Sequence, residues 1–382
     1  MNSTFQKEIV REQLAARGFS RRGFGRVASL LTAGAALPFY NEFALAQRAA
    51  RVEPPAGTIR ISSNENPLGP SEKALEAIYT VAKNGGRYGA ADSRGYIQTA
   101  AGVDGVKPNY ITPYAGSSDP LYRATVAFTS PTKSFVMGDP GYEAGARAAQ
   151  FIGAKVHRIP LRPDFAHDVK AMVAADPNAG VIYICNPNNP TGTMTSREDI
   201  EWVIANKPKG SILLLDEAYI HFSTDTPGTD LVAQDKDVIV LRTFSKLYGM
   251  AGIRAGLAIA RPDLLEKLNN FGAGMLPVTG TAAALASLRE TELVPSRRKI
   301  NKDIRENVFE FMDKKGYKYV PSESCKFMLE VNRPGREVFD ALLAKGVMIG
   351  RTWPVWPTKV RVSIGTQEEM NKFKTAIAEV MG

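Results

Sequence analysis

Cysteine, histidine and long apolar runs are scarce in this sequence. The 382 residues include two cysteines, Cys185 and Cys325, and three histidines. Two cysteines do not make a disulfide framework, and the histidines lack the spacing of metal ligands, so we expect no disulfides and no metal. The net charge of +9 is dispersed, without a basic stripe interleaved with aromatic residues. Small anionic ligands therefore fit this charge better than nucleic acid does.

The first 46 residues differ from the rest of the chain. They contain the pair Arg21-Arg22, then an uncharged stretch at 27–41 and the small-residue tripeptide at 44–46. This order is typical of a twin-arginine signal peptide with its cleavage site. The uncharged stretch is shorter than the roughly 20 residues that span a bilayer, so we expect no stable membrane anchor. We predict a cleaved signal at 1–46 and export of the folded protein to the periplasm, with an amphipathic basic helix or an uncleaved anchor as alternatives.

Short apolar runs alternate with helical stretches from about residue 71 to residue 275. The clearest runs, each apolar on consecutive residues, lie at 134–137, 181–185, 212–215, 238–241 and 257–260. This pattern indicates buried parallel strands in an α/β sheet. A long, charged helical region follows at 281–315, and shorter strands and helices come after it. These last segments predict a second α/β lobe.

Polar residues follow three of these runs. Asn189 lies in Asn-Pro-Asn-Asn-Pro-Thr-Gly, Asp216 and Tyr219 in Asp-Glu-Ala-Tyr, and Lys246 in Thr-Phe-Ser-Lys. Ligands of open α/β sheets bind beyond the carboxyl ends of the strands. We therefore expect the three turns to converge on one crevice.

Lys246 is the most informative of these residues. Thr243 and Ser245 place hydroxyls beside it, and Arg254 follows eight residues later. An amine among phosphate-binding groups suits a Schiff base with pyridoxal 5'-phosphate, whose phosphate the hydroxyls and the guanidinium would hold. The carboxylate of Asp216 can pair with a protonated pyridine nitrogen. Its alternative role is that of a helix N-cap.

Together these motifs resemble those of the fold-type-I aminotransferases, and within them the histidinol-phosphate aminotransferase family. The three turns occur in the order and spacing of that superfamily, and Ser-Asn-Glu-Asn-Pro-Leu-Gly-Pro at 63–70 is a signature of the family. The resemblance implies an α/β fold in which a large domain with a mostly parallel central sheet, flanked by helices, carries a smaller α/β domain. We place the cofactor-binding large domain at 86–275 and the small domain at 276–382, with 47–85 as an N-terminal segment that joins the small domain.

The resemblance also implies a role for each matched residue. Lys246 is expected to form the Schiff base and to move the substrate proton, Asp216 to pair with the ring nitrogen, and Asn189 and Tyr219 to contact the ring hydroxyl. The other expected contacts are the phosphate ligands Ser117, Ser118, Thr243, Ser245 and Arg254, the ring-stacking Tyr142, and Tyr88, which would reach the phosphate of the neighbouring subunit. A homodimer with shared active sites follows from the role of Tyr88.

The expected substrate contacts are two arginines. By the same resemblance Arg361 binds the carboxylate or phosphate of the substrate and Arg351 lies near it, although either could be a surface ion-pair partner. Lys326 stands where the family commonly has Asn. Trp353 and Trp356 are either core residues or the lining of a pocket for a larger apolar side chain.

The function that these observations favour is amino-group transfer between an amino acid, or an amine resembling histidinol phosphate, and a 2-oxo acid. A lyase or a decarboxylase on the same scaffold is the alternative within enzymes, because cofactor geometry is shared among these activities. A cofactor-binding regulatory protein is the alternative from another class. The substrate-binding role implied for Arg361 argues against it.

Overall fold

A computed structural model of the protein describes residues 12–33, 54–89, 91–271 and 275–382. The tripeptide at 44–46, predicted to hold the cleavage site, lies outside the described residues. Within the described ranges we find no helix that combines the length and the apolar character of a bilayer-spanning segment. The same ranges contain no group of three or more metal-ligating side chains.

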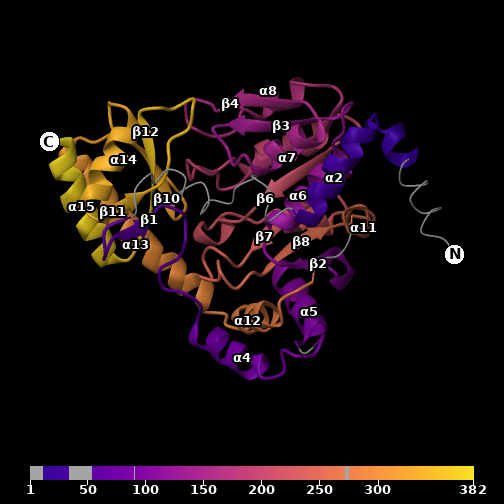
Figure 1. The fold of residues 1–382 in the computed structure, drawn as a ribbon, viewed down its shortest axis with the longest axis horizontal. Helices are drawn as coiled ribbons and strands as arrows, with labels where there is room; N and C mark the ends of the chain where they lie inside the picture. Colours follow the sequence, from indigo (N-terminus) through magenta and orange to yellow (C-terminus); the bar gives the residue numbers. More distant parts are fainter. Residues whose placement is uncertain (1–11, 34–53, 90, 272–274) are drawn as a thin grey trace.

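In the described part of the chain, seven strands form the central sheet (Figure 1). In spatial order they are β2 (Ile111–Tyr114), β8 (Gly256–Ala260), β7 (Val238–Thr243), β6 (Ile212–Asp216), β5 (Ala179–Cys185), β3 (Ser134–Asp139) and β4 (Val156–Pro160). The five strands β3 to β7 run parallel, as a mostly parallel α/β sheet requires. The apolar runs predicted as strands thus lie in the sheet.

The strand β8 departs from the prediction. The sequence predicts a parallel strand at 257–260, and this is wrong, because β8 is antiparallel to both β7 and β2. A parallel return needs a crossover, usually a helix, whereas the connection from β7 to β8 contains no helix. Buried strands of either direction read as apolar runs when both of their faces are covered, so the sequence pattern does not separate the two cases.

Helices cover both faces of this sheet because successive strand residues point to opposite sides. On one face, strand residues such as Tyr183 and Leu214 pack with α2 (Arg21–Ala33), α6 (Ser118–Phe128), α7 (Ala144–Ile152) and α11 (Pro262–Asn269). On the other, residues such as Ile182 and Leu213 share a core with α4 (Glu72–Ala82), α5 (Ser93–Asp104), α8 (Val169–Ala174), α9 (Arg197–Asn206), α10 (Thr229–Ala233) and α12 (Val278–Leu288). Two 3₁₀ turns, η1 (Pro108–Tyr110) and η2 (Ile220–Phe222), complete this part.

The C-terminal residues form a second α/β unit, at the left of Figure 1, where the colour runs to yellow. Helix α13 (Leu293–Lys315) leads into it, so the charged region predicted at 281–315 consists of two helices, α12 and α13. Strand β10 (Lys326–Glu330) pairs antiparallel with β9 (Tyr319–Val320) and β12 (Lys359–Ser363), beside α14 (Gly335–Ala344) and α15 (Gln367–Met381). The N-terminal strand β1 (Ile59–Ile61) joins this unit by pairing with β11 (Val347–Ile349). Its neighbour α4 packs instead on α12, which also packs on α5.

The N-terminal helix α2 packs on α6 and α7. Arg17, which precedes it, donates hydrogen bonds to the carbonyl oxygens of Val126, Ala127 and Thr129 at 2.5, 3.0 and 2.8 Å. The buried apolar residues of this segment are Leu14, Phe19, Val27 and Leu30. The side chains of the arginine pair at 21 and 22 are exposed to solvent.

Candidate active site

The three predicted turns lie beside one another. They follow β5, β6 and β7, which are neighbours in the sheet and run parallel, so their carboxyl ends share one edge. Backbone hydrogen bonds link these strand ends. The amide of Asn186 donates to the carbonyl of Asp216 at 2.9 Å, and the amide of Glu217 donates to the carbonyl of Leu241 at 3.0 Å. The predicted convergence is therefore present in the structure.

The Lys246 side chain follows β7 at this edge and is partly buried. Its Nζ donates a hydrogen bond to the carbonyl oxygen of Ser63 at 3.2 Å and lies 5.7 Å from the centroid of the Tyr219 ring. Its positive charge also lowers the pKa of Asp216. An amine thus interacts with a carboxylate and a phenol from the adjacent strand end.

Asp216, the last residue of β6, is 3% exposed. One carboxylate oxygen accepts a hydrogen bond from the Tyr183 hydroxyl at 2.8 Å, and the other accepts from the backbone amide of Ala218 at 3.1 Å. Burial raises the pKa of Asp216, and these two donors and the charges of Lys326 and Lys246 counter that rise. The alternative N-cap role is wrong, because the helical turn after Asp216 starts at Ile220 with Tyr219 as its cap residue.

The predicted phosphate ligands gather around Arg254. Its guanidinium donates to the Ser245 hydroxyl at 3.2 Å and to the carbonyl of Ala115 at 3.1 Å, and the Thr243 hydroxyl donates to Ser245 at 2.9 Å. Arg254 thereby joins the turn after β7 to the loop after β2. In that loop Ser117 is the N-cap residue of α6 and Ser118 is the first residue of the helix. A helix N-terminus, hydroxyls and a guanidinium together suit a phosphate group.

Backbone conformation holds this arrangement in place. Gly116 has a φ of +93° and Arg254 a φ of +70°, both in the left-handed region that non-glycine residues rarely adopt. A Cβ atom at Gly116 would lie only 2.2 Å from a guanidinium nitrogen of Arg254. Glycine is therefore required at 116 for the arginine to lie against the loop. A non-glycine residue in the left-handed region is a common mark of a functional site.

Arg361 reaches the same region from β12 of the C-terminal unit. It is 1% exposed, and its guanidinium donates to Asn189 Oδ1 at 3.0 Å and to the carbonyl of Ser62 at 2.6 Å. The guanidinium carbon lies 5.5 Å from the centroid of the Trp353 ring, which is itself buried. The alternative of a surface ion pair is therefore wrong for Arg361.

Three other predicted residues are placed less centrally. Arg351 forms an ion pair with Glu143 at 2.6 Å and stacks over Trp353, with 3.8 Å between the guanidinium carbon and the ring centroid. Tyr142 is partly buried and interacts electrostatically with Arg254. Tyr88 lies apart from the other residues, in the segment between α4 and α5, and is 91% exposed.

Known proteins are similar to this chain in sequence and in fold. The family model of the class I and II aminotransferases matches residues 56–377. The histidinol-phosphate aminotransferase of Moorella thermoacetica is 32% identical over 334 residues, which cover 85% of each chain. The chain belongs to the class I and II aminotransferases.

Solved structures agree with this aminotransferase fold. A putative histidinol-phosphate aminotransferase from Erwinia carotovora atroseptica is 31% identical, with a TM-score of 0.81 and coverage of 86% of this chain and 98% of the other. The histidinol-phosphate aminotransferase of Sinorhizobium meliloti, solved in complex with pyridoxal 5'-phosphate, is 25% identical, with a TM-score of 0.80 and coverage of 92% and 96%.

Two polar residues of this candidate site were not predicted from the sequence. Asn64, fully buried, donates to the Tyr219 hydroxyl at 3.0 Å and accepts a hydrogen bond from the Ser363 hydroxyl at 3.0 Å. Tyr183 donates to Asp216. The motif at 63–70 points to the region of Asn64 but not to its partner, which is 155 residues away in the sequence. The bond from Tyr183 depends on β5 and β6 being neighbours, which their order alone does not fix.

We expect the substitution Tyr183→Phe to move the acid limb of the aminotransferase pH profile to higher pH. The lost hydroxyl donates to the ionised form of Asp216, so its removal raises the pKa of this carboxyl further and favours the neutral form. The shift should be about one pH unit. It is measured as kcat/KM against pH.

The matched control for this prediction is Tyr114→Phe, which removes a buried hydroxyl that donates to Asn269 instead. We expect the control to keep the wild-type profile. An acid limb at the same pH in Tyr183→Phe and in the wild type would contradict the coupling between Tyr183 and Asp216.

Proposed function

We propose that this aminotransferase transfers an amino group between an amino acid, or an amine resembling histidinol phosphate, and a 2-oxo acid, with Lys246 as its Schiff-base lysine. Its cofactor is pyridoxal 5'-phosphate. The observation that carries the proposal is the meeting of one amine and one buried carboxylate, Lys246 and Asp216, at a sheet edge that also holds the group of Ser245 and Arg254.

The donor set of the site fits a phosphorylated pyridine ring. Asp216 supplies a buried anion for the ring nitrogen, and Asn189 and Tyr219 supply polar groups for the ring hydroxyl. The phosphate would be held by Ser117, Ser118, Thr243, Ser245 and Arg254, and Tyr142 would stack on the ring. The glycine at 116, where a side chain would strike Arg254, keeps the phosphate end of the site open to backbone contacts.

Each residue then has a chemical task. When bound, the cofactor supplies an aldehyde for the Lys246 amine and a ring that stabilises negative charge at the substrate α-carbon. Asp216, in its ionised form, favours a proton on the ring nitrogen. Lys246, once its nitrogen is released, acts as the base that moves the proton at the substrate α-carbon. Arg361 binds the substrate carboxylate through its planar, bidentate guanidinium.

A product assay tests this proposal against its alternatives. The purified holoprotein is incubated with single amino acids, without a 2-oxo acid, and the products are quantified. Transamination predicts equal amounts of pyridoxamine phosphate and a 2-oxo acid. Release of ammonia or of carbon dioxide instead would support a lyase or a decarboxylase. Bound cofactor with no turnover across a broad panel of amine donors would support a regulatory role.

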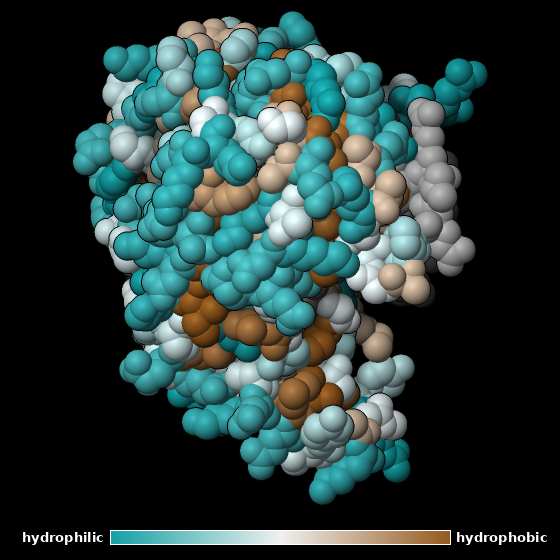
Figure 2. Space-filling model, turned by 90° about the vertical axis from the view of Figure 1, so that its left-hand side faces the viewer, coloured by the Kyte–Doolittle hydropathy of each residue, from teal (hydrophilic) through white to brown (hydrophobic). Residues whose placement is uncertain are grey.

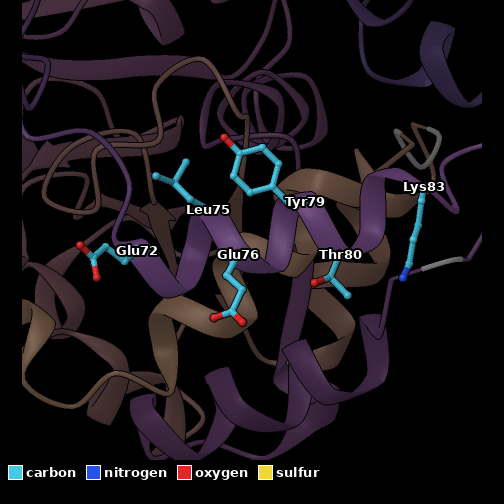
Figure 3. Close-up of a pocket in the computed structure, with 6 residues that line it drawn as sticks. All are labelled: Glu72, Leu75, Glu76, Tyr79, Thr80 and Lys83. Carbon is cyan, nitrogen blue, oxygen red and sulfur yellow. The ribbon is translucent and has the colours of Figure 1, made fainter.

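We also propose that the aminotransferase is a homodimer that uses the outer face of α4. Figure 3 shows Leu75 and Tyr79 projecting from this helix, on a surface groove that Glu72, Glu76, Thr80 and Lys83 also line. Leu75 is 38% exposed and Tyr79 is 76% exposed, although both are large and hydrophobic. Figure 2 shows hydrophobic residues among hydrophilic ones in the lower half of one face of the molecule. Exposed apolar patches of this kind support a protein interface.

For the full-length chain, whose mass is 41.5 kDa, the expected solution mass is twice that value, measured by light scattering. The substitution Tyr79→Glu should lower this mass, because a charge would be buried in an apolar contact. The control Lys73→Glu places a glutamate on the same helix at an exposed position outside this groove, and it should keep the wild-type mass. A wild-type mass of 41.5 kDa would contradict the dimer.

We propose, finally, that the aminotransferase is exported folded to the periplasm by the twin-arginine route. The support is the order of Arg21-Arg22, an uncharged stretch and a small-residue tripeptide, with both arginine side chains exposed at the start of α2. Replacing both arginines by lysine should keep the protein in the cytoplasm, because this route reads the arginine pair as an address. Cell fractionation followed by immunoblotting measures the outcome. Equal periplasmic amounts of the variant and the wild type would contradict the proposal.

A further inference from the structure

Lys326 is a second lysine beside the proposed Schiff-base residue. It begins β10 and is fully buried. Its Nζ lies 3.2 Å from the centroid of the Tyr219 ring and donates a hydrogen bond to the Ser324 hydroxyl at 2.9 Å. In the part of the chain that the structure describes, no carboxylate lies within ion-pair distance of this nitrogen. The ammonium is therefore held by a hydroxyl and by the face of a phenol ring.

The charged and titratable groups around Lys326 come from several elements. Arg361 on β12 and Lys246 after β7 are cations that disfavour its charge, while Asp216 at the end of β6 is an anion that interacts with it. The remaining groups are the thiols of Cys185 and Cys325, both buried and free, and the Tyr219 phenol. Burial, the largest effect, lowers the pKa of Lys326 to about 8, so the amine is mostly protonated at neutral pH.

Tyr219 connects the two lysines. Lys326 Nζ lies on its ring at 3.2 Å, and Lys246 Nζ lies 5.7 Å from the same centroid. The hydroxyl of this phenol accepts a hydrogen bond from Asn64 and, in the proposed function, contacts the ring hydroxyl of the cofactor. A cation on the face of a phenol withdraws electron density from it and makes its hydroxyl a stronger hydrogen-bond donor. The charge also acts directly on Lys246, since the low polarity of a buried site weakens screening.

We propose that Lys326 is a positioning residue that makes the cofactor-bearing nitrogen of Lys246 release its proton more readily, through direct repulsion and through the Tyr219 phenol. The inference rests on the proposed role of Lys246. Without its proton, the Lys246 nitrogen can accept one from the ammonium group of an incoming amino acid, which leaves the substrate amine nucleophilic. Lys326 thereby allows the enzyme to accept its amine donor at lower pH.

The test is a pH titration of the visible absorbance of the purified holoprotein. Lys326→Met removes the charge and keeps a long side chain, and Lys326→Gln also keeps a hydrogen-bonding group for Ser324. Loss of a nearby positive charge favours the protonated nitrogen, so the midpoint should rise by about one pH unit in both variants. The matched control is Lys359→Met, which removes a lysine of the neighbouring strand that pairs with Glu330 away from Tyr219. Its midpoint should equal that of the wild type.

Each result decides the inference. Wild-type midpoints in Lys326→Met and Lys326→Gln would overturn it, and if the methionine variant does not fold, the glutamine variant decides alone. Loss of the visible band in both variants, with the band retained in Lys359→Met, would overturn it too, because Lys326 would then serve cofactor binding. A wild-type protein without any visible band that depends on Lys246 would overturn the proposed function itself.

Discussion

Replacement of Lys246 by alanine is expected to abolish transamination and the visible absorbance of the holoprotein together. The substitution removes the amine that interacts with Asp216 and lies 5.7 Å from the Tyr219 ring. The proposed covalent attachment and the proposed base that moves the substrate proton are both lost with it. We expect kcat to fall by at least about ten-thousand-fold. Single-turnover absorbance changes on mixing with an amino acid provide the measurement.

The control for this variant is Lys209→Ala, which removes an exposed lysine outside the site. It should keep both the absorbance and the activity. A Lys246→Ala protein that retains the visible band would show that another amine holds the cofactor. Lys326, buried beside the same phenol, would be the first residue to examine.

The second large effect is expected from Arg361→Ala, which should raise KM far more than it lowers kcat. The guanidinium is 1% exposed and sits between Asn189 and the carbonyl of Ser62, where a substrate carboxylate would meet it out of water. Loss of a buried, hydrogen-bonded charge partner costs about 2–5 kcal/mol of binding, or roughly thirty-fold to several-thousand-fold. Steady-state kinetics with a single amino acid measure the change. Arg361→Lys should recover part of it, because it keeps the charge but not the bidentate geometry.

Arg351→Ala offers a comparison, because the guanidinium of Arg351 also lies against the Trp353 ring. The guanidinium of Arg351 already pairs with Glu143 at 2.6 Å, so it contributes less binding free energy to the substrate. We therefore expect a smaller rise of KM in Arg351→Ala than in Arg361→Ala. A normal KM in Arg361→Ala would remove the assigned role of that residue. A larger rise of KM in Arg351→Ala than in Arg361→Ala would show that Arg351, and not Arg361, is the main ligand of the substrate carboxylate.

Much of the sheet and of its polar edge could be predicted from sequence. The strands β5, β6 and β7 are buried on both faces, so they read as unbroken apolar runs, and the polar turns that follow them stand out. Parallel strands bring such turns to one edge, which explains why Asp216 and Lys246 meet as predicted. The position of the serines at the start of α6 could also be predicted from the sequence, because a glycine precedes them and a helix follows.

The other contacts of the site could not be predicted, because they join segments that are distant in the sequence. Asn64 reaches Tyr219 only because β1 pairs with β11 and carries the N-terminal segment across the C-terminal unit. Lys326 is separated from Tyr219 in the sequence by helices α10 to α13 and by strands β7, β8 and β9, and its place at a position where the family commonly has Asn does not point to this phenol. The structure places it on the face of the phenol. No periodicity or motif encodes such a pairing.

Reduction of the purified holoprotein with borohydride, followed by peptide mass spectrometry, identifies the lysine that holds the cofactor. Borohydride turns the bond between cofactor and lysine into a stable amine, so the modified residue can be read from the fragment masses. We expect the phosphopyridoxyl mass on Lys246 alone, with Lys326 unmodified although it is buried beside the same Tyr219 ring. The label on Lys326 or any other lysine, or no label on a protein that shows the visible band, would contradict this expectation.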